Sequence, residues 1–232
     1  MANIILSKDR GLAEHGWLKS YHTFSFASYH NPEMVRFRGL RVINEDWVAP
    51  SEGFGTHPHD NMEIITYVIS GALSHKDSMG NVKSLLKGQV QTMSAGTGIT
   101  HSEFNGSPDE EVHLYQMWLF PKEKNITPRY HEWHPPKEIE DGKLYLIASP
   151  NGKDGSAEIN RDVNLYLSHI KSGTGVTLPL KKDRYGWLQI AVGEVELAGK
   201  TLYAGDAISF SLEDAPTIKA LKDAQILFYD LD

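Results

Sequence analysis

Cysteine is absent from the 232 residues of the chain. Its absence excludes disulfide bonds, thiolate metal ligands and cysteine nucleophiles. Any metal ion must therefore be held by histidine nitrogen and by oxygen. Long apolar runs are missing as well, since the opening apolar stretch is too short for a signal peptide and no segment approaches the roughly 18 apolar residues of a membrane span. We expect a cytoplasmic protein without membrane contact.

The sequence has little positive charge to offer an anionic partner. Its formal net charge is −7, and lysine and arginine form no long blocks. Nucleic acids and anionic membranes attract basic patches, so we expect no direct binding to either. Hydrophobic residues make up 40% of the chain and aromatic residues 10%, which is typical of a soluble globular protein.

Helical periodicity is also scarce. No segment of about 12 residues has apolar side chains at helical spacing, and residues 9–20 are at best a short helix. Instead, short segments rich in β-branched and aromatic residues recur about every ten residues between clusters of Gly, Pro, Asn and Asp. This pattern predicts an all-β protein with antiparallel strands. The clearest predicted strands are residues 40–48, 63–69, 113–120, 144–149, 164–170, 187–192 and 225–231.

A polar stretch divides the chain. Residues 121–143 are rich in proline and charge and poor in aliphatic side chains, as expected of a connection between domains. We predict an N-terminal domain at residues 1–125, a linker at 126–143 and a C-terminal domain at 144–232. Each half is about the size of a small β-barrel.

A weak internal repeat supports this division. Residues 67–96 pass through four strands, with Gly71 and Gly88 between them, and residues 190–211 follow the same order with a shorter turn. Similarity on this scale indicates two copies of one β-unit.

Two histidines form the first candidate metal pair. Side chains alternate along a strand, so His57 and His59 share one face while Pro58 points away. Pro58 donates no hydrogen bond and therefore favours a sheet edge or a strand entry. Glu63 has the same parity and would reach the same centre if the chain stayed extended. One such pair alone is weak evidence, because His-x-His arises often by chance.

A second pair follows about forty residues later. His101 and Glu103 are again two residues apart, after Gly96 and Gly98, which permit a tight turn that brings a neighbouring strand alongside the first. Three imidazoles and a carboxylate suit one first-row divalent ion such as iron, manganese, nickel, copper or zinc. The residues therefore predict one metal centre with positions open to substrate or dioxygen.

The other histidines have simpler explanations. His22, His75 and His113 lie on predicted strands and are expected to be core or rim residues, although His22 could line a pocket. His131 and His134 have helical spacing, but the prolines after them indicate a linker. The sequence also lacks a phosphate-binding loop and the Gly-x-Ser-x-Gly motif of serine hydrolases.

At these residues the sequence resembles a cupin. The first cupin motif is matched by Gly53, His57, His59, Glu63 and Gly71. The second is matched by Gly88, Gly96, Gly98, His101 and Asn105. The spacings differ slightly, and Gly96 stands where the motif usually has proline.

Four longer stretches are similar to the pirin family of cupins, specifically its bacterial quercetin 2,3-dioxygenase-like members. They are residues 15–32, 54–81, 93–105 and 113–121. The resemblance implies a bicupin of two antiparallel, jelly-roll-like β-barrels, the first holding a metal and the second without ligands. The sequence agrees, since His169 is the only histidine after residue 143.

The resemblance also implies a ligand set. In pirins the carboxylate ligand lies two residues after the last histidine, so His57, His59, His101 and Glu103 are the expected ligands. The general cupin motif would select Glu63 instead, and we favour Glu103, with Glu63 as a buried neighbour. The expected metal is one divalent transition ion, with iron first and copper, nickel, manganese, cobalt or zinc as alternatives.

The activity implied is a metal-dependent dioxygenase that cleaves flavonols such as quercetin with dioxygen and releases carbon monoxide. Glu103 would also act as general base for the flavonol hydroxyl. Three aromatic residues, Phe24, Phe26 and Phe54, are candidates for an apolar pocket mouth. The partners expected are thus a small polyphenol and O2.

Two alternatives stay open at this point. A metal- or redox-sensing regulator that binds protein partners would use the same ligands. A sugar-phosphate isomerase would need lysine or arginine near the site, and residues 57–103 offer few. The sequence does not identify the physiological substrate, the native metal or the oligomeric state.

Overall fold

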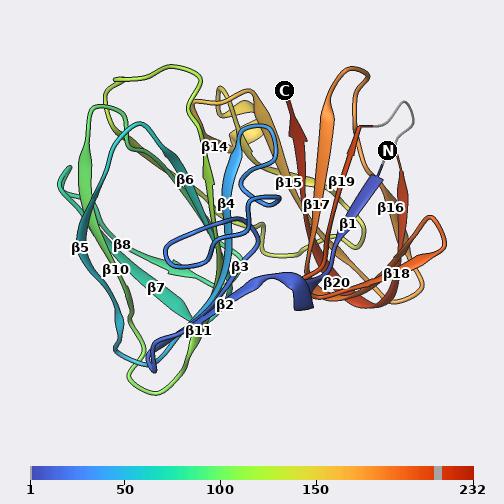
Figure 1. Cartoon of the computed structure of the whole chain (residues 1–232), viewed down its shortest axis with the longest axis horizontal. Coiled ribbons are helices and arrows are strands. Elements are labelled where there is room, and N and C mark those ends of the chain that lie inside the picture. Colours follow the sequence, from blue (N-terminus) through green and yellow to red (C-terminus); the bar gives the residue numbers. More distant parts are fainter. Residues whose placement is uncertain (1, 212–215) are drawn as a thin grey trace. The chain divides into compact units, whose positions relative to one another are not determined.

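The computed structural model describes residues 2–211 and 216–232, and almost all of its regular structure is β-strand (Figure 1). Within the described part of the chain, the helices are two short 3-10 segments, Ser7–Asp9 and Lys153–Gly155, so no helix there could cross a membrane. The all-β prediction is confirmed. The chain divides into two compact units. The first unit comprises residues 10–134 and 157–161, and the second comprises residues 1–9, 135–156 and 162–232.

The first unit contains two antiparallel sheets. In Figure 1, β5 and β10 lie on one side of this unit and β3 and β4 on the other. The smaller sheet has the order β5 (Gly53–His59), β10 (Ile99–Asn105), β7 (Ala72–Asp77), β8 (Val82–Leu86). The larger has the order β12 (Arg129–Trp133), β9 (Val90–Ser94), β6 (Glu63–Ser70), β11 (Val112–Leu119), β4 (Leu40–Val48), β3 (Leu18–His22), β2 (Gly11–Glu14). A short strand, β14 (Ala157–Glu158), also belongs to this unit.

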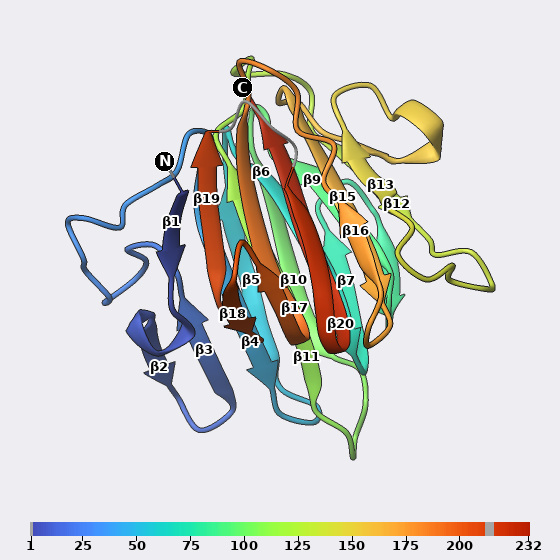
Figure 2. The same ribbon diagram turned by 90° about the vertical axis from the view of Figure 1, so that its right-hand side faces the viewer.

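The second unit is built around two long strands, which Figure 2 shows beside their neighbours. These are β17 (Tyr185–Leu197) and β20 (Thr217–Leu231). The strand order is β1 (Ala2–Ile5), β19 (Ala207–Ser211), β17, β20, β15 (Val163–Ile170), β13 (Tyr145–Ser149). In addition, β16 (Gly175–Thr177) pairs with β20, and β18 (Lys200–Tyr203) pairs with β17.

All seven strands predicted from the sequence are present, and β4 has the predicted limits. The suggested short helix at residues 9–20 is wrong, because these residues contribute to the β2–β3 hairpin, in which Gly11 pairs with His22. Gly16, with φ of +79°, lies in the turn between the two strands. In β3, buried residues alternate with more exposed ones, as expected for a strand with one face toward the core.

Part of the predicted linker is a strand. Residues 129–133 form β12, which pairs with β9 from Arg129 opposite Ser94 to Trp133 opposite Val90. Trp133 is buried, so this segment is integrated into the first unit. The many prolines and charged residues around it conceal the strand pattern in the sequence.

The repeat seen in the sequence is present in the backbone. In the first unit Gly88 N donates over 2.8 Å to Val68 O, and Gly71, three residues after Val68, has φ of +80°. In the second unit Gly205 N donates over 2.8 Å to Ile190 O, and Gly193, three residues after Ile190, has φ of +86°. The matched residues are Val68 with Ile190, Gly71 with Gly193, and Gly88 with Gly205.

The strand pairings repeat as well. The register of β11 on β6 shifts between His113 and Leu114, and the register of β20 on β17 shifts between Ile190 and Val192. Because Val68 pairs with Leu114 just as Ile190 pairs with Ile226, residues of the two units can be matched strand by strand. This matching shows which side chains occupy equivalent places in the two units.

Candidate metal centre

Three imidazoles meet on the smaller sheet of the first unit. His57 and His59 lie on β5, and His101 lies on β10 directly opposite His57. The ring centroid of His101 lies 4.4 Å from that of His57 and 4.9 Å from that of His59. One nitrogen from each ring lies within 4.8 Å of the others, which is compatible with one shared ion. The expectation that the pair His57 and His59 and the pair His101 and Glu103 lie on neighbouring strands is confirmed.

The state of these rings suits metal binding. Burial lowers the pKa of His59 to about 4 and that of His101 to about 3, so both are neutral near pH 7 and carry a lone pair. His57 Nδ1 lies 2.8 Å from Gly55 O and, as the donor to this carbonyl, leaves Nε2 as the free ligand atom.

His101 gives the strongest indication. It is 1% exposed, and neither of its ring nitrogens has a hydrogen-bond partner among the described residues. A buried polar atom without a partner costs free energy that a bound ligand would recover. The donor set therefore fits a divalent transition metal held by nitrogen and oxygen.

Glu103 lies on β10 next to these rings. It is 1% exposed and belongs to a second group of potential ligands, together with His75 and His101. The pairing of β10 with β5 is irregular between His101 and Glu103, so Glu103 lies opposite Phe54. Such an irregularity changes the direction of a side chain relative to its neighbours.

Two glutamines hold the Glu103 carboxylate. Gln91 Nε2 donates to Oε1 over 2.9 Å, and Gln116 Nε2 donates to Oε2 over 2.7 Å. Gln116 Oε1 accepts from Trp118 Nε1 over 3.1 Å, and Gln91 Oε1 accepts from Tyr130 Oη over 3.1 Å. The two donated hydrogen bonds fix the orientation of the carboxylate group. Sequence analysis missed both glutamines, because no local motif marks them.

His75 lies behind the imidazole cluster. Its ring centroid is 5.3 Å from that of His101, and its Nε2 lies 3.2 Å from Asp77 Oδ2. It was expected to be an ordinary core or rim residue, yet its Nδ1 is buried without a hydrogen-bond partner among the described residues. His75 therefore belongs to the surroundings of the site.

Glu63 lies apart from both groups of potential ligands. Its Oε2 accepts from Ser94 Oγ over 2.6 Å and from Asn160 N over 2.9 Å. Burial raises the pKa of Glu63 to about 7. It is thus a buried carboxyl group that connects β9 with residues 157–161.

A cavity of about 240 Å³ opens beside the imidazoles. His57, His59 and Glu103 line it. Its other lining residues are Leu18, Ser20, His22, Phe26, Asn44, Asp46, Phe54, Gln116 and Trp118. Phe26 and Phe54 are therefore placed as expected, whereas Phe24 is in the core and does not line the cavity.

The remaining histidines of the first unit form other contacts. His22 lines the cavity, as suggested. His113 bonds to Glu45 over 3.0 Å and stacks on Trp47. His131 and His134 lie near carboxylates, and neither belongs to a group of potential metal ligands in the described part of the chain.

The second unit has apolar residues where the first has site residues. By the strand matching, Gln91 corresponds to Ile208, His75 to Leu197 and Glu103 to Ile218. All three replacements belong to the apolar core of that unit. At these three matched places the second unit therefore has no side chain that could bind a metal ion.

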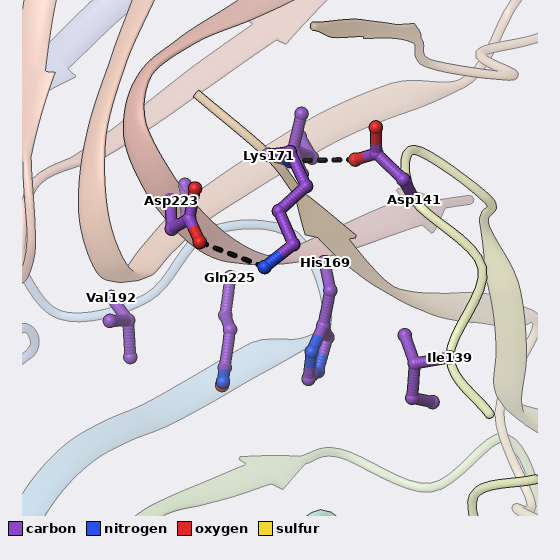
Figure 3. Close-up of a pocket in the computed structure, with 9 residues that line it drawn as sticks. Ile139, Asp141, His169, Lys171, Val192, Asp223 and Gln225 are labelled. Carbon is purple, nitrogen blue, oxygen red and sulfur yellow. Dashed lines mark hydrogen bonds and ion pairs between the residues drawn. The ribbon is translucent and has the colours of Figure 1, made fainter. Parts of the chain in front are cut away.

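The second unit has a different cavity, of about 340 Å³ (Figure 3). Figure 3 shows His169 and Gln225 side by side below Lys171, which pairs with Asp223 over 2.9 Å. No group of three potential metal ligands occurs here among the residues that the structure describes. The candidate site is therefore the one in the first unit.

Comparison with known proteins places the chain among characterised families. Residues 5–119 match the family model described as Pirin, and residues 146–231 match that described as Quercetinase C-terminal cupin domain. The chain is 43% identical over 225 residues to a protein of Escherichia coli (strain K12) named Quercetin 2,3-dioxygenase, with 97% of this chain and 96% of that protein covered. It is 42% identical over 221 residues to a Pirin-like protein of Caulobacter vibrioides, with 95% of each covered.

A solved structure agrees with these matches. It is the crystal structure of bacterial pirin YhhW from Escherichia coli in complex with nickel(II), which matches with a TM-score of 0.93 and 41% identity. The match covers 100% of this chain and 99% of that chain.

Proposed function

Because the chain belongs to the pirin family of cupins, we propose that it is a metal-dependent dioxygenase that cleaves flavonols such as quercetin. The predicted resemblance to this family and to quercetin 2,3-dioxygenases is confirmed by the matches above. The alternative of a metal- or redox-sensing regulator is not favoured, since several matching relatives are named as enzymes.

One observation carries the proposal. His101 has two buried nitrogens without partners among the described residues, and it lies beside His57 and His59, which line a cavity together with aromatic side chains. A flat polyphenol needs such an apolar cavity, and dioxygen chemistry needs a redox-active ion or substrate. Both requirements meet at this place.

We assign His57, His59, His101 and Glu103 as the residues that would hold one divalent transition metal. When bound, the metal would act as a Lewis acid toward the 3-hydroxyl oxygen of the flavonol and bring dioxygen close to it. The relative solved with nickel(II) supports a single divalent ion, and iron stays our prediction.

Glu103 is the proposed base for the flavonol 3-hydroxyl. Its carboxylate is oriented by Gln91 and Gln116, so the proton would move from the substrate hydroxyl to a positioned oxygen. Phe26 and Trp118 would contact the ring faces and exclude water. In the overall reaction both oxygen atoms of O2 enter the product and one ring carbon leaves as carbon monoxide.

We also propose that the two units are jelly-roll-like cupin barrels, one with metal and one without. The repeated glycine and strand pairings support this view. The domain division predicted at 1–125, 126–143 and 144–232 stays a prediction. The predicted division gives residues 1–9 to the N-terminal domain, but they belong to the second compact unit. It gives residues 157–161 to the C-terminal domain, but they belong to the first compact unit.

The experiment is direct. Protein loaded separately with iron, copper, nickel or manganese is mixed with quercetin, and quercetin absorbance and carbon monoxide are followed. We expect absorbance loss and carbon monoxide release together, and neither with His59→Ala. His131→Ala, outside the site, should behave as wild type. If no metal-loaded wild-type sample consumes quercetin, the proposed activity is wrong.

A further inference from the structure

The cavity beside the imidazoles has a second polar side. Ser20 and His22 lie on β3, and Asn44 and Asp46 lie on β4, in the larger sheet of the first unit. The imidazoles come from the smaller sheet. All four side chains are at most 4% exposed, and all four line the cavity.

These four residues form a connected array. Ser20 lies opposite Asp46 and His22 opposite Asn44 in the β3–β4 pairing. Ser20 Oγ donates to Asp46 Oδ1, and His22 Nδ1 lies 2.8 Å from Asn44 Oδ1 and 3.3 Å from Ser20 Oγ. The array thus holds each side chain in one orientation before any ligand arrives.

Two atoms of the array still have hydrogen-bonding capacity. With Asn44 Oδ1 as acceptor, His22 Nδ1 is the donor and Nε2 is left as an acceptor. Neither His22 Nε2 nor Asp46 Oδ2 has a hydrogen bond to another described residue. Polar atoms with free hydrogen-bonding capacity at a cavity wall are suited to the hydroxyl groups of a ligand, which can both donate and accept.

The fold itself does not require these polar groups. By the strand matching, His22 corresponds to Leu146, Asn44 to Tyr166, Asp46 to Ser168 and Gln116 to Phe228. The second unit therefore forms the same strand framework without an imidazole, an amide or a carboxylate at these places. Burying such groups costs free energy that their mutual hydrogen bonds offset only in part, and a ligand bonded to the two remaining atoms would offset more of it.

We propose that Ser20, His22, Asn44 and Asp46 form a hydroxyl-binding wall, which recognises ring hydroxyl groups of the substrate other than the one directed to the metal centre. This inference rests on the proposed function. It restricts the substrate class to flat aromatic molecules with hydroxyl groups at two separate edges. Phe26, Phe54 and Trp118 would contact the apolar part between those edges.

The test compares the binding of two flavonols. Quercetin carries several ring hydroxyl groups, and 3-hydroxyflavone carries only the 3-hydroxyl. Dissociation constants are measured by equilibrium dialysis on zinc-loaded protein, because zinc has no redox chemistry and binding can be read without turnover. We expect wild type to bind quercetin at least about tenfold more tightly than 3-hydroxyflavone, which is the gain that two or more additional hydrogen bonds would give.

The variants use replacements found in the matched positions of the second unit. His22→Leu and Asp46→Ser should each bring the ratio of the two constants close to one, while 3-hydroxyflavone binding changes less than about twofold. Lys19→Ala, on the outer face of β3, should keep the wild-type ratio. Metal content and melting temperature are measured for each variant.

Each result has a defined meaning. Equal binding of both flavonols by wild type overturns the proposal, whether or not the variants fold. A wild-type ratio of the two dissociation constants in both variants overturns the proposal too. An equal loss of affinity for both flavonols also overturns it, because such a loss indicates a structural role. If wild type fails to cleave quercetin in the activity assay but the ratio behaves as expected, the dioxygenase proposal fails and the hydroxyl-binding wall stands.

Discussion

At the scale of single residues, two carboxyl groups of similar burial have different surroundings. Glu103 accepts hydrogen bonds from two neutral carboxamides beside the imidazoles. Glu63 accepts from Ser94 and a backbone amide, away from the imidazoles, and one of its oxygens has no partner in the described structure. The same residue type can thus lie beside the imidazoles in one place and be a buried, protonatable group in another.

The first prediction concerns Gln91. Replacing Gln91 by leucine removes the donor to Glu103 Oε1, so the carboxylate loses part of its orientation. We expect metal affinity to fall about 10- to 100-fold, as is typical when a residue that orients a ligand is lost. The metal affinity of wild type and variant is measured by competition with a chelating dye. Gln89→Leu is the control, since Gln89 bonds to His134 and Leu86 instead. Unchanged affinity would contradict the role of Gln91.

The second prediction concerns the pH dependence given by Glu63. Burial raises the pKa of Glu63 from 4.5 to about 7. As the pH rises, the Glu63 carboxyl group therefore loses its proton in the unfolded chain at a lower pH than in the folded chain. The stability contribution is therefore present below pH 4.5 and is lost as pH rises to about 7, by about 3 kcal/mol. Glu63→Gln does not titrate. We expect the free energy of unfolding of Glu63→Gln, measured with urea, to increase relative to that of wild type between pH 5 and pH 8. The same difference between variant and wild type at both pH values would refute this prediction.

At the scale of elements, the turn between β9 and β10 sets where the second ligand pair begins. Gly96 has φ of +49°, a conformation that proline cannot adopt. This explains physically why the chain has glycine where the cupin motif usually has proline. A Cβ at this position would also lie 2.1 Å from Ile126 O.

The third prediction compares two glycines with positive φ. Gly96→Ala adds a collision with backbone to conformational strain, so we expect a loss of about 2–4 kcal/mol in the free energy of unfolding. Gly80→Ala, with φ of +93° and open space around its Cβ position, should cost only about 1 kcal/mol. Chemical denaturation of both variants measures the difference. Equal losses would mean that the contact with Ile126 carries no cost.

Element limits also show what sequence patterns reveal. Residues 40–48 were predicted as a strand and form β4, because β-branched and aromatic side chains recur between turn residues. The predictions for residues 9–20 and 129–133 were wrong, since the first range contains β2 and the start of β3 and the second forms β12, all of them short strands paired with neighbours. A strand of that kind depends on its sheet more than on its own composition.

At the scale of the whole molecule, one strand framework has been filled in two ways. The first unit surrounds its cavity with imidazole, carboxylate and amide groups. The second fills the matched places with side chains such as Ile208, Leu197 and Ile218, which are buried in its core. A fold therefore does not imply a site, because the site depends on which side chains point inward.

The fourth prediction follows from this difference. The chain should bind one transition metal ion, and His57→Ala combined with His59→Ala should abolish binding. Elemental analysis of protein purified without chelator gives the ratio of metal to chain. The control is His169→Ala in the second unit, which should leave that ratio unchanged. Two ions per chain, or an ion retained in the double variant, would contradict a single metal centre that depends on His57 and His59.

The sequence by itself determined the strand-rich fold, the two-part repeat and the candidate ligands. Alternation along a regular strand is a local property, so the spacing of His-x-His and His-x-Glu by itself predicts two side chains on one face. The choice between Glu103 and Glu63 also needed the resemblance to a family.

The tertiary structure alone decided which distant residues complete the site. Gln91 and Gln116 reach Glu103 from β9 and β11, and the hydroxyl-binding wall comes from β3 and β4 in the other sheet of the first unit. No local pattern in the sequence specifies such contacts, because they depend on strand register and on the packing of one sheet against another. Burial, which lowers the pKa values of His59 and His101, is likewise a property of the folded chain.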